Sequence, residues 1–186
     1  MTLDSNQVEH LMRQALAEAR YAAASGEIPI GAVVAEANGA SYEILGRGYN
    51  RNIELQRHTA HAELVALDNA SDRLIARAAE KIPPSQFSVL DRPGIVLVST
   101  LEPCIMCYSA CILSNIETVV YGLRSPADGG PGRVSMVTKP NVREPTVMKG
   151  ILAEETRELF VEWLNEYRGE RHRPFVEQLL TLTVAL

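Results

Sequence analysis

The stretch from Ile95 to Leu123, IVLVSTLEPCIMCYSACILSNIETVVYGL, decides the fold that we expect for this chain. Residues 95–100 are mostly apolar and β-branched, which is typical of a buried strand. Pro103 suits the first turn of a helix because it has no N–H to leave unpaired, so we expect a helix over residues 104–113. Residues 117–123 again have the composition of a strand. This succession predicts two parallel strands joined by a right-handed crossover.

The residues before this unit predict a helix, a hairpin and a second helix. Apolar residues recur every three or four positions over residues 8–19, as in an amphipathic helix. Residues 28–37 and 42–48 predict two strands joined by a turn. Residues 50–59 are polar and irregular, whereas residues 60–70 are rich in helix formers.

The residues after this unit divide into a loop, a helix and a tail. Residues 124–149 are rich in proline and glycine and carry five basic residues against two acidic ones, and a short edge strand is expected at 146–148. Apolar spacing predicts a helix over residues 153–167. We therefore expect one domain over residues 1–168, and a C-terminal tail over residues 169–186 that is helical and packs on the same domain.

Composition limits the classes of partner. The 186 residues carry a net charge of −5, which argues against broad binding to nucleic acid or anionic membranes. The three cysteines lack the spacing of a secreted disulfide framework, so we expect a reducing compartment, the cytoplasm. No stretch approaches the roughly 18 apolar residues of a membrane span, and no targeting signal is visible, so no membrane partner is expected.

Two short segments far apart in the sequence together predict a metal site. Residues 61–63 read HAE and residues 103–107 read PCIMC, so the chain contains the pattern H-x-E…P-C-x-x-C. Catalytic Zn²⁺ takes three protein ligands and keeps a fourth position for water, and His61, Cys104 and Cys107 supply three suitable donors. Two cysteines three positions apart lie on one face of a helix. This pattern is an established signature of zinc-dependent base deaminases.

Glu63 is the predicted catalytic residue of this site. Residues two positions apart on a regular helix point to nearly opposite faces. His61 and Glu63 can therefore share a site only at the start of the helix. By itself Glu63 would be a solvated helix carboxylate. Beside a zinc ligand it fits a general acid and base, which takes a proton from water and delivers it to the base and the leaving amine.

The C-x-x-C pattern has two other interpretations. A non-catalytic, zinc-stabilised binding scaffold would hold a closed four-coordinate metal, and Cys111 is the candidate fourth ligand, although free cysteine is more often a small buried hydrophobe. A thiol redox protein would instead form a reversible disulfide between Cys104 and Cys107 without any metal.

The chain resembles the cytidine/deoxycytidylate deaminase superfamily and, within it, the tRNA-specific adenosine deaminase branch. The resemblance implies an α/β fold, a three-layer α/β/α sandwich whose five-stranded mixed sheet has helices on both faces, with a bound Zn²⁺ and a homodimeric assembly. The stretches that carry it are EIPIGAVV at 27–34, GRGYNR at 46–51, TAHAE at 59–63, TLEPCIMC at 100–107 and VVYG at 119–122.

The resemblance also implies substrate contacts. It places a hydrogen bond between Asn50 and the substrate base. Apart from the resemblance, the backbone N–H groups of Ala62 and Cys104 belong to expected helix starts, where they can bind a substrate oxygen or the tetrahedral intermediate. This chain has Arg57-His58 where the tRNA enzymes have Asp-Pro, and Tyr108-Ser109 where they have two small residues. We therefore expect His58 and Tyr108 to contribute to substrate binding.

The leading hypothesis is a hydrolytic nucleobase deaminase in which hydroxide attacks the amino-bearing ring carbon and ammonia leaves. We place adenosine in a tRNA anticodon stem-loop ahead of a free base, nucleoside or nucleotide such as guanine, cytosine or their nucleosides. The acidity of the chain opposes an RNA substrate held through phosphates. The basic residues of segments 124–149 and 168–173 favour one.

Overall fold

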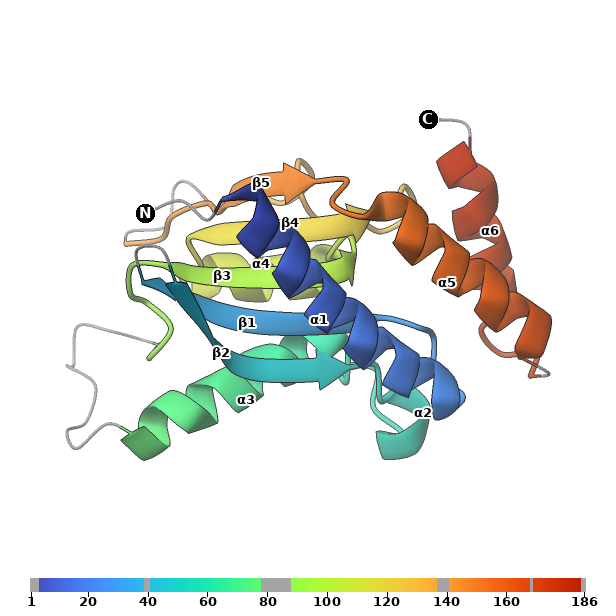
Figure 1. Cartoon of the computed structure of the whole chain (residues 1–186), viewed down its shortest axis with the longest axis horizontal. Coiled ribbons are helices and arrows are strands. Elements are labelled where there is room, and N and C mark those ends of the chain that lie inside the picture. Colours follow the sequence, from blue (N-terminus) through green and yellow to red (C-terminus); the bar gives the residue numbers. More distant parts are fainter. Residues whose placement is uncertain (1–3, 39–40, 78–87, 137–140, 168, 185–186) are drawn as a thin grey trace.

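The computed structural model describes residues 4–38, 41–77, 88–136, 141–167 and 169–184. At its centre lies a mixed sheet of five strands in the order β2-β1-β3-β4-β5 (Figure 1). β1 pairs antiparallel with β2 and with β3, whereas β3, β4 and β5 run parallel. The expected mixed sheet and parallel β3–β4 pair are confirmed. The strands are β1 Gly31–Asn38, β2 Ser41–Tyr49, β3 Ile95–Leu101, β4 Thr118–Leu123 and β5 Thr146–Lys149.

Helices cover both faces of the sheet, so the expected three-layer α/β/α sandwich is also confirmed. In Figure 1, α1 lies in front of the sheet and α4 lies behind it, and α3 packs on the same side as α4. The helices are α1 Ser5–Ala24, α2 Asn52–Leu55, α3 Ala62–Arg77, α4 Ile105–Leu113, α5 Ala153–Glu166 and α6 Arg173–Val184.

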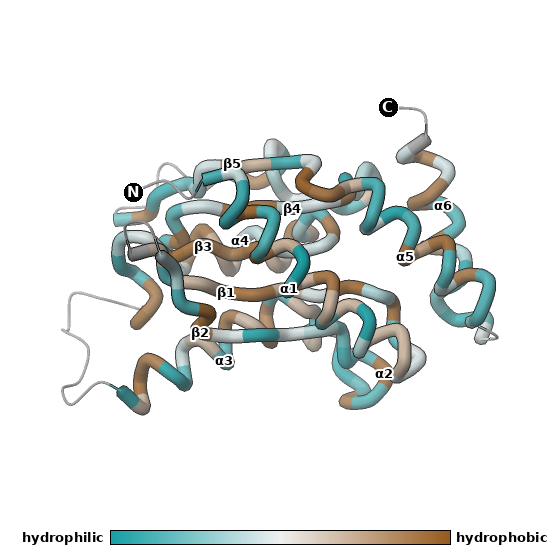
Figure 2. The backbone as a smooth tube through the Cα atoms, viewed as in Figure 1, coloured by the Kyte–Doolittle hydropathy of each residue, from teal (hydrophilic) through white to brown (hydrophobic). Residues whose placement is uncertain are grey.

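Alternation along the middle strands builds two cores. In β1, Val33 and Ala35 pack with α1, whereas Ala32 and Val34 pack in the larger cluster with α3 and α4. Side chains of a strand alternate between its two faces, so an entirely apolar strand serves both cores at once. Figure 2 shows this hydrophobic character along β1 and β3.

The observed helix boundaries refine three expectations. α3 continues to Arg77, beyond the stretch of helix formers at residues 60–70, and residues 52–55 form a short helix within the segment expected to be irregular. Pro103 does not open α4, because Cys104 has extended backbone angles and is the N-cap, so the helix starts at Ile105. Residues 78–87 lie outside the described residues.

The tail, residues 169–186, was expected to be helical and to pack on the preceding domain. α6 lies beside α5 (Figure 1), and its buried residues Val176 and Leu179 join the larger core cluster together with Phe160 of α5. Within the described part of the chain, no helix is long and apolar enough to cross a membrane.

Candidate metal centre and its cavity

Three predicted ligand residues come together where α3 and α4 begin. The Sγ atoms of Cys104 and Cys107 are 3.6 Å apart, and His61 Nδ1 lies 3.7 Å from the first and 3.6 Å from the second. Two ligands at about 2.3 Å from a tetrahedral Zn²⁺ are separated by about 3.7 Å. The donor atoms of this triad therefore fit zinc, with one coordination position left for water or substrate.

The two thiols of the triad differ in acidity. The hydrogen bond from Cys107, opposed by burial and supported by His61, lowers the pKa of Cys104 to about 4. The pKa of Cys107 is raised, because of its hydrogen bond with the Cys104 sulfur and because the thiol is buried. Zn²⁺ binds cysteines as thiolates, so metal binding would release the remaining thiol protons.

Close packing against β2 positions the start of α3. A Cβ atom on Gly48 would lie 2.3 Å from the backbone oxygen of Ala62, and one on Gly46 would lie 2.2 Å from that of Ala66. Only glycine at these positions lets α3 lie this close to the strand. The position of His61, immediately before α3, therefore depends on two glycines of β2.

Glu63 lies in the first turn of α3 beside the triad. Its side chain is only 3% exposed, and Ser99 Oγ donates a hydrogen bond to its Oε1 at 3.4 Å. Burial raises the pKa of this carboxyl, although the charge of His61 opposes the shift. A carboxyl with a raised pKa beside a metal site is suited to accept and release a proton near neutral pH.

Asn50 is buried at the floor of the same site. Its side-chain Oδ1 accepts a hydrogen bond from the backbone N–H of Ala62 at 2.9 Å. The backbone N–H of Asn50 donates to the backbone oxygen of Ile30 at 3.1 Å. The expectation that the Ala62 N–H binds substrate is therefore not met, because this helix-start donor already has an acceptor within the protein. Among the described residues, no hydrogen bond occupies Asn50 Nδ2, which leaves an amide donor for a ligand.

A cavity of about 850 Å³ opens over the triad and is lined by His61, Cys104, Glu63 and Asn50, among others. His58, for which a contribution to substrate binding was expected, also lines it. This volume lies within the range of small-molecule and cofactor sites.

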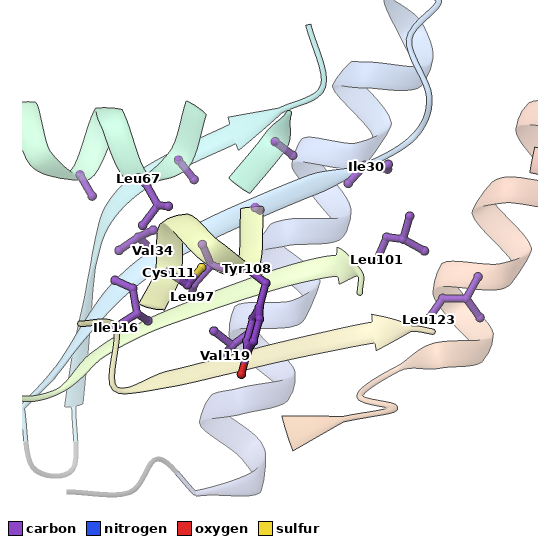
Figure 3. Packing of buried hydrophobic residues seen from close by; sticks show 14 of the residues in the cluster. Ile30, Val34, Leu67, Leu97, Leu101, Tyr108, Cys111, Ile116, Val119 and Leu123 are labelled. Carbon is purple, nitrogen blue, oxygen red and sulfur yellow. The ribbon is translucent and has the colours of Figure 1, made fainter. Parts of the chain in front are cut away.

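Tyr108 and Cys111 lie away from this cavity, in the apolar core (Figure 3). Tyr108 is only 3% exposed and is not among the described residues that line the cavity. Its Cβ packs under the backbone of Gly130, where a Cβ would come within 2.5 Å. Cys111 is fully buried and outside the triad, as expected of a small hydrophobe.

Several cavity residues were not predicted from sequence. Glu27 and Glu102 line the cavity, and both lie in stretches that carry the family resemblance, but neither suggested a role by residue type alone. Arg171, His172 and Phe175 line it from the C-terminal tail. No local sequence signal places this tail next to residues 50–63, because the contact arises only when α6 packs on the folded domain.

Comparison with known proteins agrees with the geometry. The model of the cytidine and deoxycytidylate deaminase zinc-binding region matches residues 5–123. The tRNA-specific adenosine deaminase of Aquifex aeolicus is 32% identical over 162 residues, which cover 87% of this chain and 96% of that protein.

Solved structures agree as well. A structure from studies of A-to-I editing by tRNA:A34 deaminases has a TM-score of 0.63 at 32% identity, covering 81% of this chain and 98% of that one. A guanine deaminase from Nitrosomonas europaea has a TM-score of 0.64 at 27% identity, covering 83% of each chain. The chain therefore belongs to the cytidine and deoxycytidylate deaminase family, within the branch of the tRNA-specific adenosine deaminases, and is a zinc-dependent deaminase.

Proposed function

We propose that this enzyme hydrolytically deaminates adenosine in tRNA and that Glu63 is its catalytic proton carrier. The observation that carries the proposal is the buried Glu63 carboxyl, which lines one cavity with His61 and Cys104 of the metal-binding triad. A solvated helix carboxylate would be exposed and would keep an ordinary pKa, whereas this carboxyl is buried and its pKa is raised.

The residues around Glu63 suggest how the reaction proceeds. Bound Zn²⁺ supplies a Lewis acid that makes water a nucleophile near pH 7. The Glu63 carboxylate takes a proton from the attacking water and gives protons to the ring nitrogen and the departing amine, so water and an amino group become a carbonyl and ammonia. Ser99 holds one carboxyl oxygen, and Asn50 Nδ2 donates to the base and orients it.

The preference for adenosine in tRNA rests on relatives. The curated relatives from Aquifex aeolicus and Bacillus subtilis are tRNA-specific adenosine deaminases and match over most of this chain. A second candidate is the free base guanine, since the Nitrosomonas europaea guanine deaminase has an equally similar fold.

A screen for ammonia release tests both candidates. The substrates are free bases, nucleosides, nucleotides and a stem-loop RNA with adenosine at the wobble position, and Glu63→Ala is the control. We expect wild-type turnover of the stem-loop only, and zinc-loaded but inactive Glu63→Ala protein. Turnover of guanine without turnover of RNA would make guanine the substrate in place of adenosine in tRNA. An active Glu63→Ala enzyme would refute the role of Glu63 as proton carrier.

We also propose a homodimer that works in the cytoplasm. The outer face of α4 supports the assembly, because Ile105 is 49% exposed and Leu113 is 44% exposed on this short helix. An exposed apolar helix face of this kind is typical of a protein interface. The location is supported by the triad, whose two thiols must stay reduced to bind zinc.

A further inference from the structure

The acidic residues of the cavity already have donors within the protein. Glu27 Oε1 accepts two backbone N–H groups at the start of α2, at 2.7 and 2.9 Å. Glu102 Oε2 accepts the backbone N–H of Ser125 at 2.8 Å, and the hydroxyl of Ser125 donates to Asp128. These three carboxylates therefore do not need a cationic ligand to satisfy them.

Two arginines of the cavity wall, in contrast, lack partners among the described residues. Arg57 and Arg171 line the cavity with exposed side chains, and neither forms an ion pair or a side-chain hydrogen bond within the described part of the chain. Their neighbours differ, because Arg51 pairs with Glu54 at 2.7 Å and Arg173 donates to the backbone oxygens of Leu164 and Tyr167. The two unpaired guanidinium groups face the cavity from segments that are far apart in the sequence.

His172, next to Arg171, gives an independent sign that this wall faces a ligand. Its Nε2 atom is buried and has no hydrogen-bond partner among the described residues, and the ring lines the same cavity. A buried polar atom without a partner costs on the order of 1–3 kcal/mol.

We propose that Arg57 and Arg171 bind a phosphate group of the substrate in this cavity, on the wall that His172 also lines. Guanidinium groups pair with phosphate oxygens through two parallel hydrogen bonds. The cavity of about 850 Å³ is large enough for a nucleotide as well as its base.

The identity of the base, adenine, is taken from the proposed function. The phosphate contact does not depend on it. The phosphate is either that of a polynucleotide or that of a free nucleotide. In both cases the substrate class excludes a bare base and an unphosphorylated nucleoside.

The salt dependence of RNA binding tests the inference. A fluorescent stem-loop RNA is titrated with protein at several NaCl concentrations, and binding is followed by anisotropy. Each phosphate neutralised on a single strand contributes about 0.7 to the slope of log K against log salt. Because the two arginines share one phosphate, we expect Arg57→Gln and Arg171→Gln each to weaken binding and to reduce this slope, and the double variant to reduce it by about 0.7 in total. The matched control is Arg20→Gln, an exposed arginine of α1 outside the cavity, which leaves the slope unchanged.

Calorimetry separates the two sources of phosphate. Tighter binding of adenosine 5′-monophosphate than of adenosine, without any RNA binding, would assign the phosphate to a free nucleotide. Slopes unchanged by both cavity variants, or equal binding of nucleotide and nucleoside in a chain that binds no RNA, would overturn the inference. Ammonia release reports the proposed function separately, since a chain that binds RNA through the two arginines without turnover would refute only the deamination of that substrate.

Discussion

Asn50 combines two tasks that one pair of substitutions can separate. Its Oδ1 accepts the Ala62 N–H at the start of α3, and its Nδ2 is proposed to hold the base. Asn50→Asp keeps the acceptor oxygen and loses the donor, so we expect kcat/KM to fall by about 10- to 100-fold with little change in Tm. Asn50→Ala loses both groups and lowers Tm as well. Full activity of Asn50→Asp would show that Nδ2 does not contact the substrate.

Cys111 distinguishes a catalytic zinc site from a closed structural one. The cysteine is fully buried in the core and lies outside the triad, so Cys111→Ala is expected to retain one zinc per chain and ammonia release. Cys107→Ala removes a ligand, and we expect it to lose both. Metal content is measured by atomic spectrometry after gel filtration. Loss of zinc from Cys111→Ala would instead favour a four-ligand scaffold.

At the scale of single residues, the sequence predicts which side chains can bind a metal better than it predicts which groups contact one another in the fold. His61, Cys104 and Cys107 were identified because metal coordination needs particular donor atoms at particular spacings, and the fold then brought them together. Ala62 and Tyr108 were placed less well. Whether a backbone N–H or a ring is free for substrate depends on its neighbours in space, and sequence spacing does not reveal them.

Among the elements, the contact of β2 with α3 is the one that sets the site. Gly48→Ala places a methyl group against Ala62 O, next to His61. We expect a loss of about 1–3 kcal/mol, or roughly 2–4 °C in Tm per kcal/mol, together with weaker zinc binding. Gly46→Ala meets the second turn of α3 and serves as the matched variant, with a similar loss of stability and a smaller effect on zinc. Unchanged Tm and zinc affinity in Gly48→Ala would show that α3 can move away without cost.

A cluster of charges also joins β2 to the far end of α3. Glu43 accepts hydrogen bonds from Arg77 at 2.6 and 2.9 Å and from Arg73 at 2.6 Å. The hydrogen bond from Arg77 is the main cause that lowers the pKa of Glu43 below its ordinary value near 4.5. A lowered carboxyl pKa stabilises the folded state above the unfolded value, and that stabilisation is lost as pH falls through the folded value.

Glu43→Gln should therefore lower the urea midpoint at pH 7 by a small amount, because the cluster is exposed to solvent. The difference from wild type should shrink as pH falls below about 4.5, where protonation disrupts the same contacts in the native protein. High salt should also reduce the difference at pH 7, because mobile ions screen exposed charges. A difference that is independent of pH and salt would mean that packing, and not charge, joins Glu43 to α3.

Element types followed from the sequence, but several boundaries did not. The apolar runs of β1, β3 and β4 and the spacing in α1 and α5 identified these elements correctly. The helix formers at residues 60–70 identified α3 but not its end at Arg77. Pro103 was expected in the first turn of α4, but the extended backbone of Cys104 makes Cys104 the N-cap and starts the helix at Ile105.

For the molecule as a whole, the set of residues that line the cavity could not be predicted from the sequence. Its walls come from the strand ends, the loop before α3, the start of α4 and the tail. The tail was predicted as a helix on the same domain, but its part in the cavity depends on how α6 packs against α5. The sequence therefore could not predict that Arg171 and His172 line the cavity.

The outer face of α4 makes a prediction about assembly. Ile105 and Leu113 lie two helical turns apart on one face of α4, with the partly exposed Ser109 between them. We expect a dimer by light scattering during gel filtration, and monomers of Ile105→Glu and Leu113→Glu, since a buried unpaired carboxylate is incompatible with the interface. Val161→Glu on α5, also an exposed apolar position, is the control and should remain dimeric with an unchanged circular dichroism spectrum. A monomeric wild type, or dimers of both α4 variants, would place the assembly on another surface or exclude it.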